Sequence, residues 1–517
     1  MANLASVMEE RARRLGFWSQ PAFVVDDRTW THAEVHRGAA HASALLASVG
    51  VGRDARVLIV VGDGIEAVWA FLGTVRLGGL AIPVNPRLTA DDHASLAADA
   101  RPAAVVCAAE LADRFATTGV VRSDDLAATV SAALDGGDDS DVPAAAEVGD
   151  ESPAYAQYTS GTTGRPKAAV HRHADALVYF RAFAEGAIRM TGDDVVLSVS
   201  KMFFAYGLGN SLFFPLLSGC RALLDPGPPR PDNVARLVGC HGVTVLFSVP
   251  TLYARLVAAC GTGEFRSLRV AVSAGEALTA VLAERCRSLL GCPILDGLGS
   301  TEVGQTFASN TLDAQRDATV GRALPPYELT VTDEAGRDVD VGQVGTLWVR
   351  GPTVLVEYLD RPDATAAVMR GCWLSTADRA AIDADGFVHH RGRVDDIEVV
   401  GGINVAPLEI EAVLVAHPSV SEVAVAAVRD PMGASRLEAF VVAGPDAGAG
   451  GSSEVLAGDV LARELIALAR ANLAPHKAPR AVHFVDALPR TPTGKLRRFL
   501  LRGDATVRNP GREETLR

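Results

Sequence analysis

Short apolar runs alternate with helix-length amphipathic segments through the first three quarters of the chain. Residues 56–61 (RVLIVV) and 243–249 (VTVLFSV) are mostly apolar and rich in β-branched side chains, which predicts buried strands. Further elements are predicted as strands at 103–107, 268–273 and 293–298 and as helices at 63–77, from Pro250 and at 278–290. Because continuous apolar strands that alternate with helices are typical of parallel sheets covered on both faces, the pattern predicts an α/β fold.

The pattern changes after Val344, where shorter strands such as 345–349 begin. The C-terminal part then shows a small set of its own elements, namely a helix around 408–416, strands at 423–428 and 437–442, a helix at 454–473 and basic residues at 495–502. We therefore expect a large N-terminal domain, residues 1–394, of mainly parallel sheets covered by helices with a small β-barrel-like subdomain. A small α+β C-terminal domain, residues 395–517, should follow it.

Charge and composition restrict the partners. The 517 residues include 49 Lys and Arg against 62 Asp and Glu, a formal net charge of −13, which is a poor electrostatic match for nucleic acid or an anionic membrane surface. The most apolar stretch, 57–84, is interrupted by Asp63, Glu66 and Arg76, so no bilayer span fits. None of the seven cysteines forms a CxxC pair, which indicates buried thiols in a reducing compartment. We expect a soluble, cytoplasmic protein that binds neither nucleic acid nor membrane and acts as a monomer or homodimer.

Residues 158–167, YTSGTTGRPK, are the strongest candidate for chemistry. Glycines let backbone N–H groups approach an anion closely, and the Ser and Thr hydroxyls add donors, so this composition suits a phosphate-binding loop. The loop is not a Walker A motif, because Pro166 precedes the lysine where that motif has Gly. By local composition alone, a solvated Gly/Thr turn remains an alternative.

This loop resembles the signature loop of the adenylate-forming superfamily, which contains acyl-CoA synthetases, adenylation domains and luciferases. Other segments resemble that family's motifs in the family's order, at 296–302 (DGLGSTE), 373–378 (WLSTAD), 392–396 (GRVDD) and 492–495 (PTGK). Together the matches cover nearly the whole chain. The resemblance implies an enzyme that uses ATP and Mg²⁺ to activate a carboxylic acid, releases pyrophosphate and transfers the acyl group to a thiol.

The resemblance also implies roles for individual residues. The β- and γ-phosphates of ATP would be held by Lys167 together with Thr159, Ser160, Gly161, Thr162, Thr163 and Gly164. Adenine, ribose and the adjacent phosphate would be bound by Gly275, Glu276, Asp296, Gly297, Asp378 and Arg393. The catalytic candidates are Thr301, Glu302 as the Mg²⁺ ligand, and Lys495 as the bridge between the carboxylate and the α-phosphate. Taken without the resemblance, Glu302 would fit a helix first turn and Lys495 a solvated surface.

In this family the small domain rotates between two half-reactions, and the resemblance places the hinge at Asp395. Gly401 and Gly402 would then line the tunnel that admits the pantetheine arm of the acceptor. One position departs from the family pattern, since Val399 stands where a lysine is common. The positive charge of that lysine is therefore absent here, which affects the electrostatics of the second half-reaction.

Residues 201–210, KMFFAYGLGN, resemble the benzoate-CoA ligases. The segment has no acidic residue in its pocket positions, and a buried ammonium without a partner is costly, which disfavours an α-amino acid. By resemblance, the acid pocket is formed by Phe204, Ala205, Tyr206, Gly297, Leu298, Gly299 and Gln305. Glycines opposite aromatic side chains suit a planar ring, and the Gln305 amide, where His is common, suits a ring with a small hydroxyl or amino group. The same aromatic side chains would also fit a core stripe.

We therefore expect an aryl-acid ligase that forms aryl-AMP from benzoate or a close analogue and transfers the aryl group to coenzyme A. An acyl carrier protein, loaded on its phosphopantetheine thiol, is the alternative acceptor; the acidic surface favours coenzyme A mildly. Further alternatives are a non-catalytic acyl-adenylate binder, an oxygenase of the luciferase kind and a plain ATPase. The presence of Glu302, Asp378 and Lys495 argues against the binder.

Overall fold

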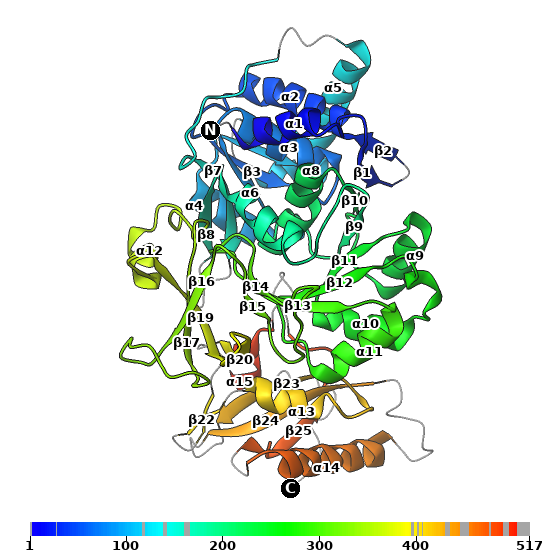
Figure 1. Cartoon of the computed structure of the whole chain (residues 1–517), viewed down its shortest axis with the longest axis vertical. Coiled ribbons are helices and arrows are strands. Elements are labelled where there is room, and N and C mark those ends of the chain that lie inside the picture. The colour runs from blue at the N-terminus through cyan, green and yellow to red at the C-terminus, as the bar shows by residue number, and fades with distance from the viewer. Residues whose placement is uncertain are drawn as a thin grey trace. The chain divides into compact units, whose positions relative to one another are not determined.

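The computed structural model describes residues 3–26, 28–115, 119–137, 142–159, 166–393, 398–400, 403–405, 407–429, 435–444, 454–474, 477–489 and 496–503. The chain forms two compact units, and each is described by itself. The first contains Met1–Thr330, Trp348–Thr376 and Asp385–Val388, and the second contains Val331–Leu347, Ala377–Ala384 and His389–Arg517. Figure 1 labels their helices and strands.

A nine-stranded sheet in the first unit has the order β15-β14-β13-β12-β11-β9-β10-β1-β2. Neighbouring strands from β13 to β1 are parallel, and the pairs at the two edges are antiparallel. The strands are β1 (Pro21–Val25), β2 (Arg28–Thr31), β9 (Val195–Ser198), β10 (Arg221–Leu224), β11 (Val245–Ser248), β12 (Val270–Ala274), β13 (Ile294–Gly299), β14 (Thr306–Ser309) and β15 (Arg322–Ala323).

Three helices cover one face of this sheet. They are α9 (Pro231–His241), α10 (Pro250–Ala259) and α11 (Ala280–Leu290), which gather beside β11, β12 and β13 in Figure 1. Leu246, Ala271 and Ile294 enter a common core with these helices. Because the parallel strands end together at one edge, the residues that follow β12 and β13 lie next to each other.

A second, six-stranded sheet of the first unit has the order β6-β5-β3-β4-β7-β8. All neighbours are parallel except the final pair, which is an antiparallel hairpin. The strands are β3 (Arg56–Val60), β4 (Leu80–Pro83), β5 (Ala104–Cys107), β6 (Val120–Arg122), β7 (Pro153–Thr159) and β8 (Lys167–Arg172). The hairpin carries the predicted phosphate loop between its strands, so the sheet edge fixes both ends of that loop.

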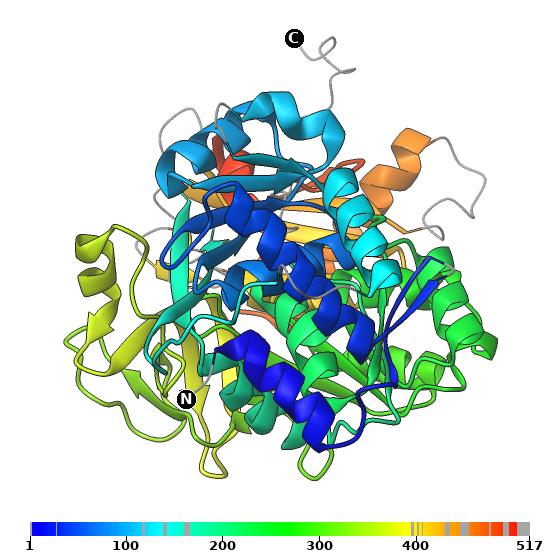
Figure 2. The same cartoon turned by 90° about the horizontal axis from the view of Figure 1, so that it is seen from above.

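The N-terminal helices pack together over this unit (Figure 2, blue). They are α1 (Leu4–Arg14), α2 (His32–Ser48) and α3 (Ile65–Arg76), with α4 (Ala90–Ala100), α5 (Ser123–Gly136) and the 3-10 helix η1 (Ala109–Arg114) following in the chain. Thr31 starts α2 through a capping box with Glu34. Helices α2 and α3 approach closely, since a Cβ at Gly38 would lie 2.2 Å from the Trp69 indole nitrogen.

The segment between β8 and β10 is mostly helical. It contains α6 (Asp175–Tyr179), the π-helix η2 (Phe180–Glu185), α7 (Ala205–Leu208), the π-helix η3 (Gly209–Phe213) and α8 (Phe214–Ser218). A further 3-10 turn, η4 (Gly263–Phe265), precedes β12. π-helical turns are frequent at functional sites, and η3 directly follows the predicted acid-binding residues.

A five-stranded sheet follows, in the order β16-β17-β19-β18 with β20 paired to β19. Its elements are β16 (Glu328–Thr332), β17 (Gly345–Arg350), α12 (Pro362–Val368), β18 (Met369–Arg370), β19 (Trp373–Ile382) and β20 (Val388–Arg393). This sheet accounts for the expected small β subdomain, but the expectation of shorter strands is wrong, because β19 has ten residues and β17 and β20 have six each.

The second unit has an α+β core. Its three-stranded sheet pairs β23 (Val420–Arg429) antiparallel with β24 (Ser435–Ala443), and β24 parallel with β25 (Ala481–Phe484). Its other elements are the hairpin β21 (Glu398–Val400) and β22 (Ile403–Val405) and the helices α13 (Pro407–Leu414), α14 (Glu454–Asn472) and α15 (Arg498–Gly503). The buried Ile410, Val441 and Leu465 show that α13 and α14 pack on this sheet.

The expected fold class is therefore confirmed, with large parallel sheets covered by helices, a separate five-stranded sheet and a small α+β unit. The expected hinge, Asp395, lies outside the described residues, so the boundary at that residue stays a prediction. In the part of the chain that the structure describes, no helix combines the length and apolar character needed to cross a bilayer.

Candidate active site

The predicted phosphate loop connects the end of β7 to the start of β8. Thr159 pairs with Lys167 across the last rung of the hairpin, so the structure brings these two predicted ATP-binding residues together. Ser160, Gly161, Thr162, Thr163 and Gly164 lie outside the described residues. The Lys167 ammonium lies 4.5 Å from the centroid of the Tyr358 ring, a cation–π contact.

The predicted metal ligand, Glu302, sits in a tight turn between β13 and β14. Gly304 N donates to the Ser300 carbonyl at 3.0 Å and closes the turn. Gly304 has a φ of +85°, and a Cβ there would lie 3.1 Å from the His171 and Tyr179 rings, so both conformation and space require glycine. The backbone of the turn is therefore tightly specified.

Side chains from three other segments hold this turn. His171 Nε2 lies 2.7 Å from the Thr301 carbonyl oxygen, and because that oxygen only accepts, Nε2 donates to it. His171 Nδ1 is 3.3 Å from an Asp175 carboxylate oxygen. The Tyr358 hydroxyl donates to Glu302 Oε1 at 2.8 Å. These contacts fix both the backbone beside Glu302 and the orientation of its carboxylate.

The predicted adenine-binding residues lie at the ends of β12 and β13. Ser273 is the register partner of Asp296, and Ala274 that of Gly297, so Gly275 follows directly beside them. Asp296 is buried, and its Oδ1 has no hydrogen-bond partner among the described residues. Burial holds the pKa of this carboxyl well above its usual range. A neutral carboxyl can both donate and accept, which suits the polar edge of a heterocycle.

Glu276 has a structural role in addition to its predicted one. Its Oε2 accepts hydrogen bonds from the backbone N and hydroxyl of Thr251, in the first turn of α10. A carboxylate in that position satisfies an otherwise free helix N–H and interacts favourably with the helix dipole.

The predicted acid-pocket residues come from two neighbouring segments. Phe204, Ala205 and Tyr206 lie at the start of α7. The predicted glycines and Leu298 lie on β13, and Gln305 lies just before β14. The Tyr206 ring packs edge-on against Phe247 at 6.0 Å between ring centroids. The structure brings Tyr206 and Gln305 together, because Gln305 Nε2 donates to the Tyr206 carbonyl at 3.3 Å.

The Gln305 amide is engaged within the protein. Besides the Tyr206 carbonyl, its nitrogen donates to Asn210 Oδ1 at 3.4 Å, and its oxygen accepts from Thr306 N at 2.9 Å and from the Thr306 hydroxyl at 3.0 Å. Gln305 is only 2% exposed. A ring substituent that bonded to this amide would have to replace one of these partners.

The glycines opposite this segment also have a packing role. A Cβ at Gly297 would lie 3.1 Å from Ser309 Oγ and from the Thr306 methyl carbon, and a Cβ at Gly299 would lie 2.8 Å from the Gln305 carbonyl oxygen. Both glycines therefore allow the close antiparallel approach of β14. Leu298, between them, pairs with Ala308.

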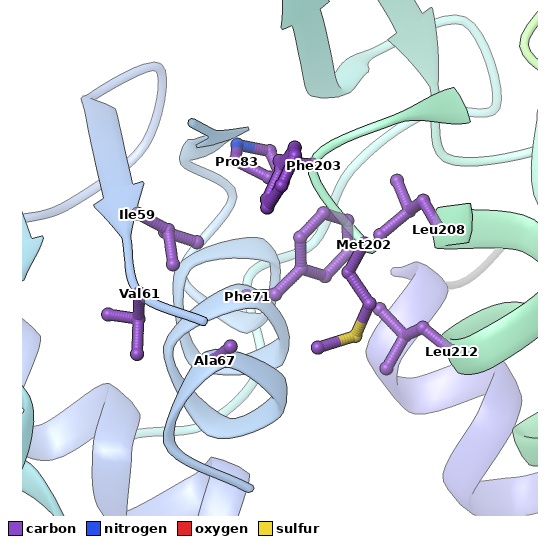
Figure 3. Close-up of a pocket in the computed structure, with 9 residues that line it drawn as sticks. All are labelled: Ile59, Val61, Ala67, Phe71, Pro83, Met202, Phe203, Leu208 and Leu212. Carbon is purple, nitrogen blue, oxygen red and sulfur yellow. The ribbon is translucent and has the colours of Figure 1, made fainter. Parts of the chain in front are cut away.

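A small apolar pocket is lined in part by the predicted acid-binding segment, residues 201–210 (Figure 3). It is lined by Met202, Phe203 and Leu208 of this segment and by Leu212 of η3. The other lining residues are Ile59, Val61, Ala67, Phe71 and Pro83, from β3, α3 and β4 and their connections. Next to it, the buried Asp63 carboxylate accepts from Met202 N at 3.0 Å. Burial raises the pKa of Asp63 to about 6, against the opposing effect of Lys201.

The predicted ribose ligand belongs to the second unit. Asp378 Oδ1 lies 3.2 Å from His390 Nε2 and 3.8 Å from an Arg393 guanidinium nitrogen, so the structure brings Asp378 and Arg393 together. Ala377, just before it, has a φ of +58°, a conformation that non-glycine residues rarely adopt. The remaining predicted residues, Lys495, Asp395, Gly401 and Gly402, lie outside the described part of the chain, as does the side chain of Val399.

The sequence did not single out Tyr358, His171 or Asp175. His171 and Asp175 lie four residues apart, but nothing in the sequence places them near Glu302. Tyr358 occurs in VEYLD, which has no motif of its own. Only the fold brings these residues to the Glu302 turn.

Comparison with known proteins assigns this site to a family. The sequence profile described as "AMP-binding enzyme" matches residues 8–359, and the profile "AMP-binding enzyme C-terminal domain" matches residues 409–495. A p-hydroxybenzoic acid–AMP ligase, FadD22, of Mycobacterium tuberculosis is 43% identical over 501 residues, which cover 97% of this chain and 68% of that protein. A benzoate–CoA ligase of Thauera aromatica is 36% identical over 477 residues, or 89% of this chain and 88% of that protein.

Solved structures agree with the fold. The benzoate CoA ligase from Burkholderia xenovorans LB400 superposes with a TM-score of 0.87 at 33% identity, covering 97% of this chain and all (100%) of that one. The anthranilate CoA ligase AuaEII, in complex with anthranoyl-AMP, superposes with a TM-score of 0.88 at 29% identity and covers 96% of both chains.

Proposed function

The chain belongs to the AMP-binding, adenylate-forming enzyme family, and we propose that it activates p-hydroxybenzoate or a close aryl carboxylic acid as the aryl adenylate. In the first step a carboxylate oxygen attacks the α-phosphorus of ATP, the bond to the bridging oxygen breaks, and pyrophosphate leaves. In the second step a thiolate attacks the aryl carbonyl carbon and AMP leaves.

This proposal rests on the contacts that Lys167 and Glu302 both make with Tyr358. The Lys167 ammonium lies over the ring, and the Glu302 carboxylate accepts a hydrogen bond from the hydroxyl. The lysine stands at the base of the phosphate loop, and the carboxylate stands at the end of the strand that also contributes to the acid pocket. A cation and a carboxylate so placed suit a triphosphate and its accompanying metal ion.

Glu302 fits a magnesium site shared with a substrate. Among the described residues, its second oxygen, Oε2, has no hydrogen-bond partner, and no group of three His, Cys, Asp or Glu residues could hold a metal ion without a substrate. Mg²⁺ is commonly bound by one or two carboxylates and by substrate phosphates, so a single glutamate is the expected donor set. When bound, Mg²⁺ offsets charge on the triphosphate.

The acid specificity rests on the pocket and on the relatives. The segment Lys201–Gly209 offers no carboxylate for an ammonium group, and Tyr206 with the glycine-rich end of β13 suits a flat ring. The relative at 43% identity is named for p-hydroxybenzoic acid, and another at 36% for benzoate. These observations favour p-hydroxybenzoate as the first acid to test.

For the acceptor, the comparisons favour the carrier protein over coenzyme A. The relative at 43% identity is named for the AMP ligation alone, whereas two relatives named for CoA are 36% and 35% identical. The acidic surface alone favours coenzyme A. We therefore propose the phosphopantetheine thiol of an acyl carrier protein as the acceptor, with coenzyme A as the second candidate.

The test is pyrophosphate release across p-hydroxybenzoate, benzoate, anthranilate, an alkyl acid and an α-amino acid. Reactions with the best acid are then repeated with coenzyme A and with a phosphopantetheinylated acyl carrier protein. The proposal expects release with aryl acids and faster thioester formation on the carrier protein. Release that is fastest with the alkyl or amino acid would refute the acid assignment, and faster turnover with coenzyme A would reverse the acceptor assignment.

A further inference from the structure

Residues 354–361 run beside the phosphate-loop hairpin as an additional extended segment. Val356 N donates to the Val170 carbonyl at 2.9 Å, Val170 N donates to the Glu357 carbonyl at 3.0 Å, and Leu359 N donates to the Ala168 carbonyl at 2.8 Å. Tyr358 thereby faces Ala169 of β8 in an isolated antiparallel bridge. The position of Tyr358 relative to the base of the loop is fixed by backbone hydrogen bonds.

Both ends of this segment are anchored to other parts of the first unit. At its start, Leu355 N donates to the Glu302 carbonyl at 2.8 Å. At its end, Asp360 pairs with Arg56 through two hydrogen bonds of 2.8 and 2.9 Å and also with Arg101. The segment therefore connects the Glu302 turn, the hairpin and β3.

Tyr358 makes two different contacts from this fixed position. Its ring lies under the Lys167 ammonium at 4.5 Å, and its hydroxyl donates to Glu302 Oε1 at 2.8 Å. The side chain is buried, with only 3% of the residue exposed. A hydrogen bond to one carboxylate oxygen restricts rotation of the carboxylate, and a ring face attracts a cation placed over it.

We propose that Tyr358 is a positioning residue of the nucleotide site, which orients the Glu302 carboxylate toward the metal ion and holds the Lys167 ammonium toward the phosphates. This inference rests on the proposed function, because it takes Glu302 as the metal ligand. Hydrogen-bond donors to a ligating carboxylate support metal binding even though they do not touch the metal. The hydroxyl serves Glu302 and the ring serves Lys167, so the two contributions can be separated by substitution.

The test compares Tyr358→Phe, which keeps the ring and removes the hydroxyl, with Tyr358→Leu, which removes both. Mn²⁺ replaces Mg²⁺, and its binding is measured by electron paramagnetic resonance in the presence of a non-hydrolysable ATP analogue. Tyr253→Phe is the matched control, since it also removes a buried hydroxyl, one that donates to the Leu246 and Val272 carbonyls. Thermal unfolding of each variant measures the loss of stability separately.

We expect Tyr358→Phe to weaken Mn²⁺ binding by about tenfold or more, as for other partners of metal-binding carboxylates. Binding of the analogue without metal should change little in Tyr358→Phe and weaken by about two- to fivefold in Tyr358→Leu, where Lys167 loses its ring. Tyr253→Phe should leave Mn²⁺ binding unchanged. Equal Mn²⁺ affinity in wild type and Tyr358→Phe, with the fold intact, would overturn the inference.

The outcome is distinguishable from failure of the proposed function, because neither binding measurement needs an acid. If Mn²⁺ binds the wild-type complex and Tyr358→Phe weakens it, the positioning role stands even where no aryl acid releases pyrophosphate. If aryl acids release pyrophosphate while Tyr358→Phe binds Mn²⁺ like wild type, the function stands and the positioning role is wrong.

Discussion

Gly209 should be required because it makes room for the Gln305 amide. A Cβ at position 209 would lie 2.1 Å from Gln305 Nε2, closer than any real contact, so Gly209→Ala must displace the amide. If the amide moves, its buried partners on Tyr206, Asn210 and Thr306 lose their hydrogen bonds, and each unsatisfied buried group costs about 1–3 kcal/mol.

The magnitude follows from two opposing effects. An alanine normally stabilises a helical position by about 1 kcal/mol relative to glycine, which offsets part of the loss. We expect Gly209→Ala to destabilise the protein by at least about 2 kcal/mol net. In a chain of this length the unfolding temperature shifts by about 1 °C per kcal/mol, so it should fall by at least about 2 °C. The KM for the aryl acid should also rise, because Gln305 no longer holds the Tyr206 carbonyl.

A double-mutant cycle checks this reasoning by thermal unfolding. In a Gln305→Ala background the obstructing amide is absent, so Gly209→Ala should be neutral or stabilising. Gly207→Ala is the control, since a Cβ there would meet the Lys201 carbonyl oxygen at 2.0 Å, a backbone clash that Gln305→Ala cannot relieve. If Gly209→Ala cost the same in both backgrounds, the assigned role of the Gln305 amide would be wrong.

Three further predictions concern the pocket, the two half-reactions and acid stability. Ala205→Leu adds side-chain volume to the predicted pocket wall, and overpacking of this kind costs about 1–3 kcal/mol. The substitution should raise the aryl-acid KM about tenfold or more in pyrophosphate-release assays, with the ATP KM unchanged. Lys495→Ala should lose adenylation by about 100-fold yet convert preformed aryl-AMP to thioester at near the wild-type rate. Asp395→Pro should keep pyrophosphate release and lose thioester formation, because a proline at the predicted hinge blocks rotation of the small domain. Equal loss of both steps in both variants would contradict a mechanism with two domain conformations. Burial lowers the pKa of His32 to about 4 and that of His36 to about 3, from 6.5, so the unfolded state takes up protons first as the pH falls below 6.5. The free energy of unfolding should be unaffected above pH 6.5 and fall by about 2 kcal/mol per histidine by pH 5. In urea unfolding, His36→Phe should lose about 2 kcal/mol less than wild type over this pH range.

Elements with one strong local pattern could be predicted from the sequence. The strand expected at 56–61 is β3 (Arg56–Val60), and the helix expected at 278–290 is α11 (Ala280–Leu290). The turn from α7 into the π-helix η3 was not predicted. Its sequence is a mostly apolar, glycine-rich run without a period. Its geometry depends on the packing of Gly207 against Lys201 and on the long-range packing of Gly209 against Gln305.

The candidate site likewise contains residues that local sequence motifs indicate and residues that only the fold brings together. The phosphate loop and Glu302 could be proposed from the sequence because their residues form contiguous motifs, and their roles stay predictions. Tyr358 could not, because its contacts with Lys167 and Glu302 arise only when β8 and the turn after β13 come together. The bonds of the Gln305 amide likewise depend on the fold, since residue type alone does not show whether a side chain faces a substrate or its own protein.

An isotope label tests the central claim most directly. The enzyme is given p-hydroxybenzoate labelled with ¹⁸O in both carboxylate oxygens, together with ATP, Mg²⁺ and phosphopantetheinylated carrier protein, and the phosphorus-containing products are analysed by mass spectrometry. Because a carboxylate oxygen attacks the α-phosphorus and leaves with it, one ¹⁸O should appear in each AMP and none in pyrophosphate. Label in inorganic phosphate with ADP as the other product, or AMP without label, would contradict activation through an aryl adenylate.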